Sequence, residues 1–439
     1  MPDADPAHVA RLPRTPVDET VSVRLVHARL IDGTGGGPID DSEVVISGDR
    51  ISYAGPYRQQ VTDGATVVDL SGRIVLPGFI DVHVHLGTNL DTPQAEVHAA
   101  FPSEQALDTA VTIRRTLMAG ITTARDLGGI DAGFRQAIAD GTILGPRLHL
   151  ALSVLSPTGG HADYHLPNGA GTRGFATLDP IIDTDDEVRR STRLYIRSGA
   201  DVIKVCTSGG VSSPSDLPTD VGVPAGHIKI IREEAAKRQG QPVAAHAQGI
   251  KGILEAVRGG VSSVEHGYQI DAEAIDLMLA GGTTLVPTLS AALRIPDPKL
   301  VPDYLYQKKV RWSAIARDHI ASALGSGIKI AMGTDSGIGP HGQNLAELGH
   351  LVDLGLAPMD AILAGTRTAA ELLRLDDHLG TVEAGKLADL VITEIDPLGD
   401  IAALADPATI GAIVQGGRLI KDRYGWFPAA AVQPAVGGG

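Results

Sequence analysis

The sequence predicts an α/β protein that consists of a (β/α)8 TIM barrel and a small accessory β-sandwich built from both ends of the chain. Eight short apolar runs alternate with amphipathic stretches across residues 77–376, which indicates the barrel. Short alternating runs broken by turns occupy residues 21–76 and return in residues 377–426, which indicates the accessory domain. A chain of 439 residues is long enough for both units.

The two ends of the chain differ in composition from the rest. Residues 1–20 are polar and rich in proline, and residues 427–439 end in AVQPAVGGG. From these compositions we expect disordered tails at both ends. The accessory strands are expected in VSVRLVHARLI, SEVVISGD, RISYAG and ATVVDL, and then in LADLVITEI, IGAIVQGG and RLIKD.

The eight apolar runs of the predicted barrel end in small or polar residues, as strands do where they enter loops at a catalytic face. In chain order the runs are FIDVHVHL, GITTARDLGG, RLHLALSVLS, DVIKVCTSGG, PVAAHAQG, SSVEHG, TTLVPTL and KIAMGTDSG. Helices are expected between several of them, in SEQALDTAVTIRRTLMA, TDDEVRRSTRLYIRSG and IKIIREEAAKRQ. Eight such units favour a barrel over an open sheet.

The composition narrows the range of partners and compartments. The net charge is −15, no basic cluster stands out, and only 3% of the residues are aromatic, so neither nucleic acid nor a membrane surface is expected as a partner. The single cysteine, Cys206, excludes an intramolecular disulfide and a zinc site built from several thiolates. The chain has no signal-peptide pattern and no apolar run of about 20 residues, so a cytoplasmic protein is expected.

Histidine, lysine and aspartate side chains occur near the ends of these apolar runs. Side chains alternate along a strand, so the two histidines of FIDVHVHL lie on one face. Each residue taken alone has an ordinary explanation in packing or turn formation. Because strand ends converge on one rim of a barrel, the whole set predicts a single cluster of metal ligands. The six residues are His83, His85, Lys204, His246, His266 and Asp335.

This combination resembles the amidohydrolase superfamily, and within it the members with two metal ions and a carbamylated barrel lysine. The flanking segments LPGFIDVHVHL and LGTVEAGKLADLVI are also similar to that superfamily. The segments SPTGGHAD, IKVCTSGGV and GTDSGIGPHGQNLAEL resemble a narrower group. That group contains Xaa-Pro-type dipeptidases and carboxypeptidases, ochratoxin-cleaving amidases and, more distantly, imidazolonepropionase.

The resemblance implies two divalent metal ions, most readily zinc, although the same ligands accept manganese, cobalt or iron. It also implies that carbon dioxide forms a carbamate on Lys204, which bridges the two ions. An apolar strand suits Lys204 to this reaction, because burial favours the neutral, nucleophilic amine. One ion would be held by His83, His85 and Asp335, and the other by His246 and His266.

The implied reaction is the attack of a metal-bridging hydroxide on a substrate carbonyl. Asp335 would take the proton and pass it to the leaving amine. His161 would either polarise the carbonyl oxygen and contact the substrate, or stabilise its own loop. Tyr268 would bind a substrate carboxylate or serve in packing. His341 is a further expected substrate contact, and together with Asn344 it would order the loop after the last run.

The leading functional hypothesis is hydrolysis of an amide bond in a small-molecule substrate. Dipeptides, N-acyl amino acids and ochratoxin-type amides are the substrate classes that the resemblance implies. The alternative keeps the same metal site and cleaves a carbamate, a urea or a cyclic amide. Deamination is disfavoured because many deaminases of the superfamily use one metal ion and need no carbamylated lysine. A non-enzymatic scaffold is disfavoured because every ligand position is filled. A homo-oligomer is expected only by analogy with relatives.

Two patterns that imitate other motifs are rejected. GTGGGP is followed by strand-like sequence and not by a helix, so no dinucleotide site is expected. His161 and His165 have the spacing of a zinc-protease helix, but Ala162 stands where the catalytic glutamate would be. Residues 87–105 and 290–307 are expected to form walls of the substrate pocket.

Overall fold

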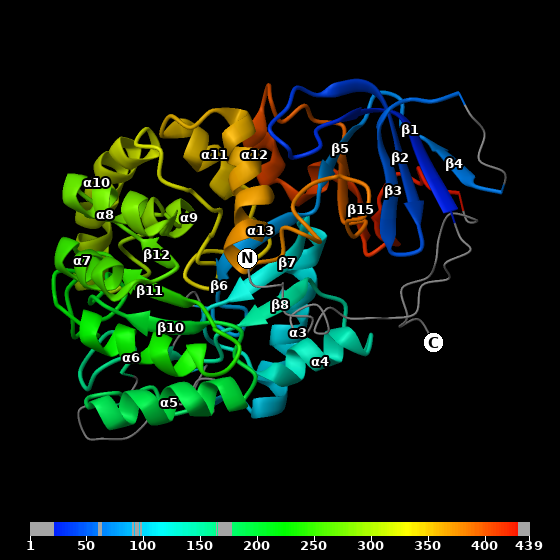
Figure 1. Ribbon diagram of the computed structural model, residues 1–439. Coiled ribbons are helices and arrows are strands. Elements are labelled where there is room, and N and C mark those ends of the chain that lie inside the picture. The colour runs from blue at the N-terminus through cyan, green and yellow to red at the C-terminus, as the bar shows by residue number, and fades with distance from the viewer. Residues whose placement is uncertain are drawn as a thin grey trace.

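The computed structural model describes residues 22–59, 64–89, 92, 96, 99–163, 165 and 178–428. The expected tails lie outside the described residues, apart from Phe427 and Pro428, and so does much of the expected pocket wall between residues 90 and 98. Two parallel sheets surrounded by helices lie beside a mixed sheet made from both ends of the chain (Figure 1). No described helix is long and apolar enough to cross a membrane.

The mixed sheet has eight strands, in the order β16-β15-β14-β5-β1-β2-β3, with β4 paired to β1. The N-terminal strands are β1 (Ser22–Leu30), β2 (Ile39–Ser47), β3 (Arg50–Pro56), β4 (Thr66–Asp69) and β5 (Ile74–Pro77). The C-terminal strands are β14 (Leu390–Thr393), β15 (Ile410–Gln415) and β16 (Arg418–Asp422). Antiparallel pairing of β5 with β14 joins the two ends of the chain. A separate apolar core beneath this sheet includes Leu25, Val44, Leu390 and Phe427.

The two parallel sheets hold most of the predicted barrel runs. One sheet contains β6 (Phe79–Val84), β7 (Ile121–Asp126) and β8 (Arg147–Leu150). The other has the order β13-β12-β11-β10-β9 and contains β9 (Val154–Leu155), β10 (Ile203–Cys206), β11 (Val243–Ala247), β12 (Ser263–His266) and β13 (Thr284–Val286). Every residue of β6, β10, β11 and β12 is buried, which explains their continuous apolar runs.

Two predicted runs do not form single regular strands. RLHLALSVLS is divided into β8 and β9, and Leu152 between them has a left-handed φ of 71°, which breaks the extended backbone. KIAMGTDSG forms only isolated bridges, from Ile330 to Leu285 of β13 and from Ser336 to Val84 of β6. This segment therefore lies between the edges of the two parallel sheets, which are assigned as separate sheets.

Helices cover the outer side of the parallel strands (Figure 1). The three predicted helices are present as α3 (Pro102–Met118), α5 (Asp185–Arg197) and α6 (Ala225–Ala236). Thr184 and Glu187 form a capping box that starts α5. The others are α4 (Ala132–Ala139), α7 (Ile250–Gly259), α8 (Ala272–Gly281), α9 (Leu289–Ala292), α10 (Asp303–Leu324), α11 (Ala346–Asp353), α12 (Pro358–Ala364) and α13 (Arg367–Leu373), with short 3₁₀ helices at Ile401–Ala405 and Pro407–Thr409.

Candidate metal centre

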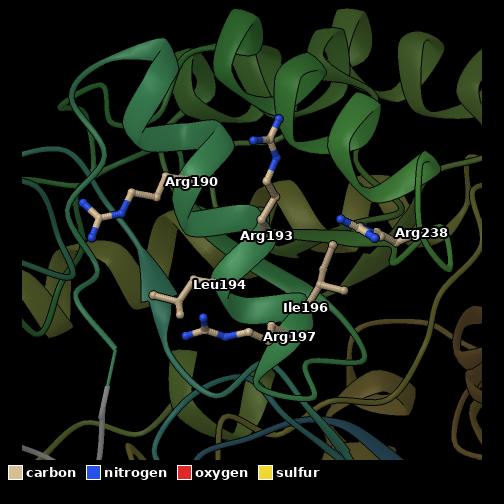
Figure 2. A pocket seen from close by; sticks show the side chains of 6 residues that line it. All are labelled: Arg190, Arg193, Leu194, Ile196, Arg197 and Arg238. Carbon is tan, nitrogen blue, oxygen red and sulfur yellow. The ribbon is translucent and has the colours of Figure 1, made fainter.

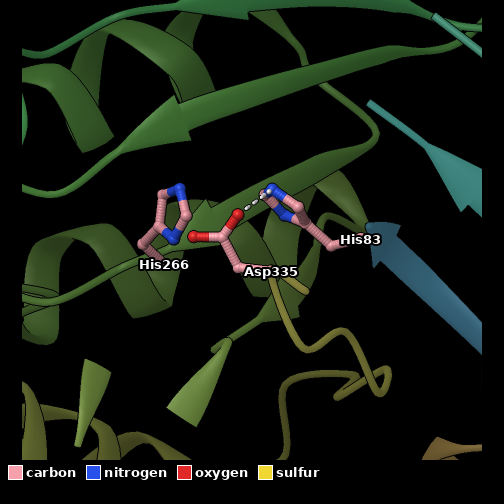
Figure 3. A group of neighbouring side chains, drawn as sticks. All are labelled: His83, His266 and Asp335. Carbon is pink, nitrogen blue, oxygen red and sulfur yellow. Dashed lines mark ion pairs between the residues drawn. The ribbon is translucent and has the colours of Figure 1, made fainter. Parts of the chain in front are cut away.

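Three side chains from distant parts of the chain converge where the parallel strands end. One ligand atom each from His83, His266 and Asp335 lies within 4.8 Å of the others, and all three residues are buried (Figure 3). His83 comes from β6 and His266 ends β12, whereas Asp335 lies in the segment between the two sheets. The parallel arrangement thus brings together groups that are separated by as many as 252 positions in the sequence.

The other predicted ligands surround this group. His85 Nε2 and His83 Nε2 each lie 3.4 Å from Asp335 Oδ1. The His246 ring, on β11, packs edge to face on the His266 ring with centroids 4.5 Å apart. The register of β11 and β12 accounts for this contact, because Ala247 pairs with His266. The structure therefore gathers all four histidines and the aspartate at one place.

Hydrogen bonds fix which nitrogen is free to bind a metal in three of the four histidines. His83 Nδ1 lies 2.8 Å from Glu265 Oε2, and His85 Nδ1 lies 2.6 Å from the Gly128 carbonyl oxygen. These oxygens accept, so Nδ1 donates and Nε2 keeps its lone pair facing Asp335. His246 has the opposite arrangement, because its Nε2 lies 3.1 Å from the Gly209 carbonyl oxygen and Nδ1 is left free.

Burial keeps these histidines in the neutral form that ligates metals. Burial lowers the pKa of His83, His246 and His266 well below the ordinary value of 6.5. Burial also lowers the pKa of His85 to about 4 and raises the pKa of Asp335 to about 7. A neutral imidazole offers a lone pair, so the environment prepares this set for a cation.

Lys204 is buried in β10. It is 2% exposed, and within the described part of the chain its Nζ has no hydrogen-bond partner. Burial lowers its pKa, and its charge contributes, after burial, to the lowered pKa values of His83, His246 and His266. An amine that is buried without a partner costs free energy, so this position favours a neutral or modified lysine.

Glu265 and Arg125 support the site, and the sequence reasoning did not include them. Glu265 is fully buried between His83 and Arg125, whose Nη2 lies 2.9 Å from Glu265 Oε1. Arg125 also donates to the Val82 carbonyl oxygen of β6. Ser263 donates to the same Glu265 oxygen. The sequence offered one indication of their role: Arg125 lies inside the apolar run GITTARDLGG, and Glu265 lies inside SSVEHG.

A second buried carboxylate holds the segment that carries Asp335. Asp81 of β6 accepts from Thr334 Oγ1 at 2.7 Å and from Asn344 Nδ2 at 2.8 Å. Burial raises the pKa of Asp81 to about 6. Asp335 itself has a left-handed φ of 57°, and His266 has one of 73°. Such conformations are costly for residues other than glycine and are retained where the surrounding contacts enforce them.

The expected substrate contacts lie around the same centre. The His161 ring stacks on the His246 ring with centroids 4.3 Å apart, and its Nδ1 lies 3.0 Å from Asp216 Oδ2. The Tyr268 ring packs edge to face on the His266 ring at 5.5 Å and is buried. His341 is held by the Thr88 carbonyl oxygen, 2.7 Å from its Nε2, so it joins the loops that follow β6 and Asp335.

The same chain matches known proteins over almost its whole length. The model of the Amidohydrolase family matches residues 74–420. The chain belongs to the amidohydrolase family. It is 32% identical to the ochratoxinase of Aspergillus niger, over 92% of this chain and 88% of that protein. It is 27% identical to an imidazolonepropionase of Caulobacter vibrioides, over 86% of this chain and 93% of that protein.

Solved structures give the same result for the fold of this amidohydrolase. A Xaa-Pro dipeptidase with bound methionine in its active site matches with a TM-score of 0.84 and 31% identity, over 91% of this chain and 100% of that chain. The ochratoxinase of A. niger matches with a TM-score of 0.80 and 29% identity, over 94% of this chain and 99% of that chain. Membership of this family identifies the protein as a hydrolase and confirms the resemblance seen in the sequence.

The donor atoms of this amidohydrolase fit a divalent metal. Neutral imidazoles and a carboxylate are the ligands that zinc and similar ions take in proteins. The Lys204 amine is also buried, and it has no hydrogen-bond partner among the described residues, which is unusual for a polar atom in a protein interior.

A surface cavity of about 600 Å³ lies elsewhere, along α5 and the end of α6 (Figure 2). It is lined by Arg190, Arg193, Leu194, Ile196, Arg197 and Arg238. Its wall contains none of the predicted ligands. Arg193 is engaged by Glu234, whose Oε2 lies 2.8 Å from Nε. The candidate metal centre at the strand ends is therefore separate from this cavity.

Proposed function

We propose that this amidohydrolase cleaves the amide bond of a dipeptide, an N-acyl amino acid or an ochratoxin-type amide, with two divalent ions, most readily zinc, as cofactors. The single observation that carries the proposal is the convergence of His83, His266 and Asp335, near a buried Lys204 whose Nζ has no hydrogen-bond partner among the described residues. The likeness to an ochratoxinase and to a Xaa-Pro dipeptidase supports the choice of an amide.

The residues present would hold the ions in two groups. His83, His85 and Asp335 would bind one ion, because their free lone pairs face each other. His246 and His266 would bind the other, and a carbamate on Lys204 would join the two groups. When bound, the ions lower the pKa of water and polarise a carbonyl group.

The chain's own residues would then carry the proton and orient the substrate. Asp335 has a pKa near 7, so it can accept a proton from the attacking water and donate it to the leaving amine. His161 is positioned by Asp216 and lies over His246, where it could hydrogen-bond to the carbonyl oxygen. Tyr268 and His341 would border the substrate.

We further propose that the parallel strands form a closed barrel and that the mixed sheet forms a sandwich. Residues 77–376 would form a closed (β/α)8 barrel, with the segment from Ile330 to Ser336 as the eighth strand between β13 and β6. Residues 21–76 and 377–426 would form an accessory sandwich, in which the eight-stranded sheet folds over its own apolar core. The isolated bridges of the eighth segment and the shared core support this description.

The test is a substrate panel with protein loaded with zinc. Release of an amino acid from dipeptides or N-acyl amino acids is expected, together with two ions per chain by elemental analysis. Asp335→Asn should lower kcat by roughly two to four orders of magnitude, since a general acid-base group is removed. Labelled bicarbonate followed by NMR would detect the carbamate, and Lys204→Met should abolish that signal. No amino acid released across the panel would refute the proposal.

A second candidate keeps the site and changes the bond. The likeness to an imidazolonepropionase, at 27% identity, favours a cyclic amide as the alternative substrate class. Carbamates and ureas belong in the same comparison because they have the same carbonyl chemistry. Ring opening of cyclic amides without cleavage of N-acyl amino acids would favour this candidate.

A further inference from the structure

Backbone in the left-handed region is concentrated at the candidate metal centre. Of the six described residues other than glycine that have a left-handed φ, three are His266, Asp335 and Thr288, which contacts His266. Thr288 is the one of these three that is not a predicted ligand. Its φ is 51° and its ψ is 47°, a conformation that is especially costly for a β-branched side chain. Such strain persists where surrounding contacts enforce it, and it is concentrated at functional sites.

The Thr288 side chain does not cap the helix that follows it. Thr288 is the N-cap residue of α9, but its side chain makes no capping hydrogen bond. A threonine in this position usually accepts a hydrogen bond from a backbone N–H of the first turn. Its Oγ1 lies instead 2.8 Å from His266 Nδ1, and Thr288 is completely buried. The hydroxyl group is therefore directed at a predicted metal ligand.

Glu347 of α11 takes over the capping of α9. Its Oε1 accepts from the Leu289 backbone N–H at 2.7 Å, and its Oε2 accepts from the Ser290 backbone N–H at 2.6 Å. The Ser290 hydroxyl also donates to Oε2, at 2.7 Å. Glu347 is completely buried. A carboxyl group from another helix thus satisfies the first N–H groups of α9 and holds the backbone directly after Thr288.

The start of α11 also holds the segment that carries Asp335. Asn344, three residues before Glu347, donates through Nδ2 to Asp81 Oδ2 at 2.8 Å. Asp81 Oδ1 accepts, at 3.2 Å, from the backbone N–H of the residue before Asp335. One helix start is therefore connected to Asp335 on one side and to His266 on the other, and these two side chains face each other in Figure 3.

We propose that Thr288 and Glu347 are positioning residues for His266. Thr288 accepts the Nδ1–H of His266 so that Nε2 faces the ion, and Glu347 holds Thr288 in the conformation that this contact needs. A hydroxyl group can donate or accept, and a metal-bound Nε2 requires that Nδ1 is the donor. The inference rests on the proposed metal-dependent hydrolase, and it adds the groups that set the tautomer of His266.

The first measurement is the tautomer of His266 in the metal-free protein. NMR of protein with ¹⁵N-labelled histidine distinguishes a protonated Nδ1 from a protonated Nε2, and a spectrum of His266→Gln assigns the signal. Wild type should carry the proton on Nδ1. Thr288→Val keeps the shape of the side chain but removes the hydroxyl, so it should shift the proton toward Nε2. Thr288→Ser should retain the wild-type tautomer.

The second measurement is zinc affinity, by competition with a chelator. Thr288→Val should weaken the binding of one ion by about 10- to 100-fold, the range for loss of a group that orients a ligating histidine, and Thr288→Ser should bind like wild type. Glu347→Gln should act in the same direction, because an amide nitrogen cannot accept the second backbone N–H. Added to Thr288→Val, Glu347→Gln should cost less than about a further twofold, since both act through one contact.

Thr192→Val is the matched control, because Thr192 is equally buried and its hydroxyl donates at 2.8 Å to the Val188 carbonyl oxygen within α5. It should change neither measurement. An unchanged tautomer or an unchanged zinc affinity in Thr288→Val, or losses that multiply in the double variant, would overturn the inference while the metal centre stands. If wild type binds no zinc, the proposed function fails and the inference fails with it. If melting curves show that Thr288→Val is unfolded, Thr288→Ala carries the comparison by the same criteria.

Discussion

Replacing Glu265 with glutamine should destabilise the protein strongly, although the two side chains have nearly the same size. Glu265 is completely buried, and its oxygens lie 2.9 Å from Arg125 Nη2 and 2.8 Å from His83 Nδ1. The substitution leaves the Arg125 guanidinium, which is 1% exposed, without its carboxylate partner. Breaking a buried ion pair in this way costs about 3–5 kcal/mol. Metal affinity should also fall by about 10- to 100-fold, because His83 loses the group that orients it.

Denaturant unfolding of the metal-free protein measures the first effect, and zinc titration measures the second. Glu233→Gln is the matched control, because Glu233 has an exposed side chain and a weak contact with Arg189 at 3.9 Å. Combining Glu265→Gln with Arg125→Met should cost less than the sum of the single changes, since both charges leave together. A loss below about 1 kcal/mol, or strict additivity, would refute the assignment of a coupled buried pair.

Three further predictions concern other buried groups. Lys204→Met should leave the metal-free protein as stable as wild type or more stable, because an unsatisfied buried amine costs about 1–3 kcal/mol. The same substitution should lower both the bound metal and the activity. Melting curves test the stability, and metal analysis tests the metal content. Burial raises the pKa of Glu347 from 4.5 to about 8, so between these values the unfolded chain releases a proton that the folded state keeps. Stability should therefore fall as pH rises through this window, by at most about 1.4 kcal/mol for each pH unit, and Glu347→Gln should flatten the slope in denaturation at several pH values. A Cβ on Gly210 would lie 2.2 Å from His161 Cε1, so Gly210→Ala should displace that ring and lower kcat/KM by roughly one to two orders of magnitude with metal content unchanged. In a His161→Ala background, Gly210→Ala should change kcat/KM little. An equally large decrease in that background would show that displacement of the His161 ring is not the cause.

Much of the candidate site could be predicted because the proposed ligands are unusual residues in apolar strands. The two histidines of β6 share a face by strand periodicity, and Lys204, His246 and His266 stand out in runs that are otherwise apolar. Glu265 and Arg125 are also charged residues in apolar runs, but the sequence analysis did not identify them. Each sits next to a more familiar motif, and only their contact across β6, β7 and β12 reveals what they do.

The strand boundaries show a similar limit. RLHLALSVLS has the composition of one continuous strand, but the left-handed backbone at Leu152 divides it into β8 and β9. KIAMGTDSG was predicted as a strand of the same kind, yet its backbone hydrogen bonds go to Val82, His83 and Leu285 without a regular ladder. Next to the left-handed turn at Asp335, the backbone N–H of Thr334 donates to Asp81, which is 253 positions away and could not be inferred from local patterns.

The amino-acid sequence by itself determined the alternation of strands and helices and the pairing of both chain ends in one sheet, and it predicted a candidate set of metal ligands. Local periodicity and side-chain chemistry are sufficient for those conclusions. Only the tertiary structure decided which nitrogen of His83, His85 and His246 is free, how burial shifts their pKa values, and that Glu265 joins His83 to Arg125. Hydrogen-bond direction and desolvation arise from neighbours that are remote in the chain, and they exist only once the chain has folded.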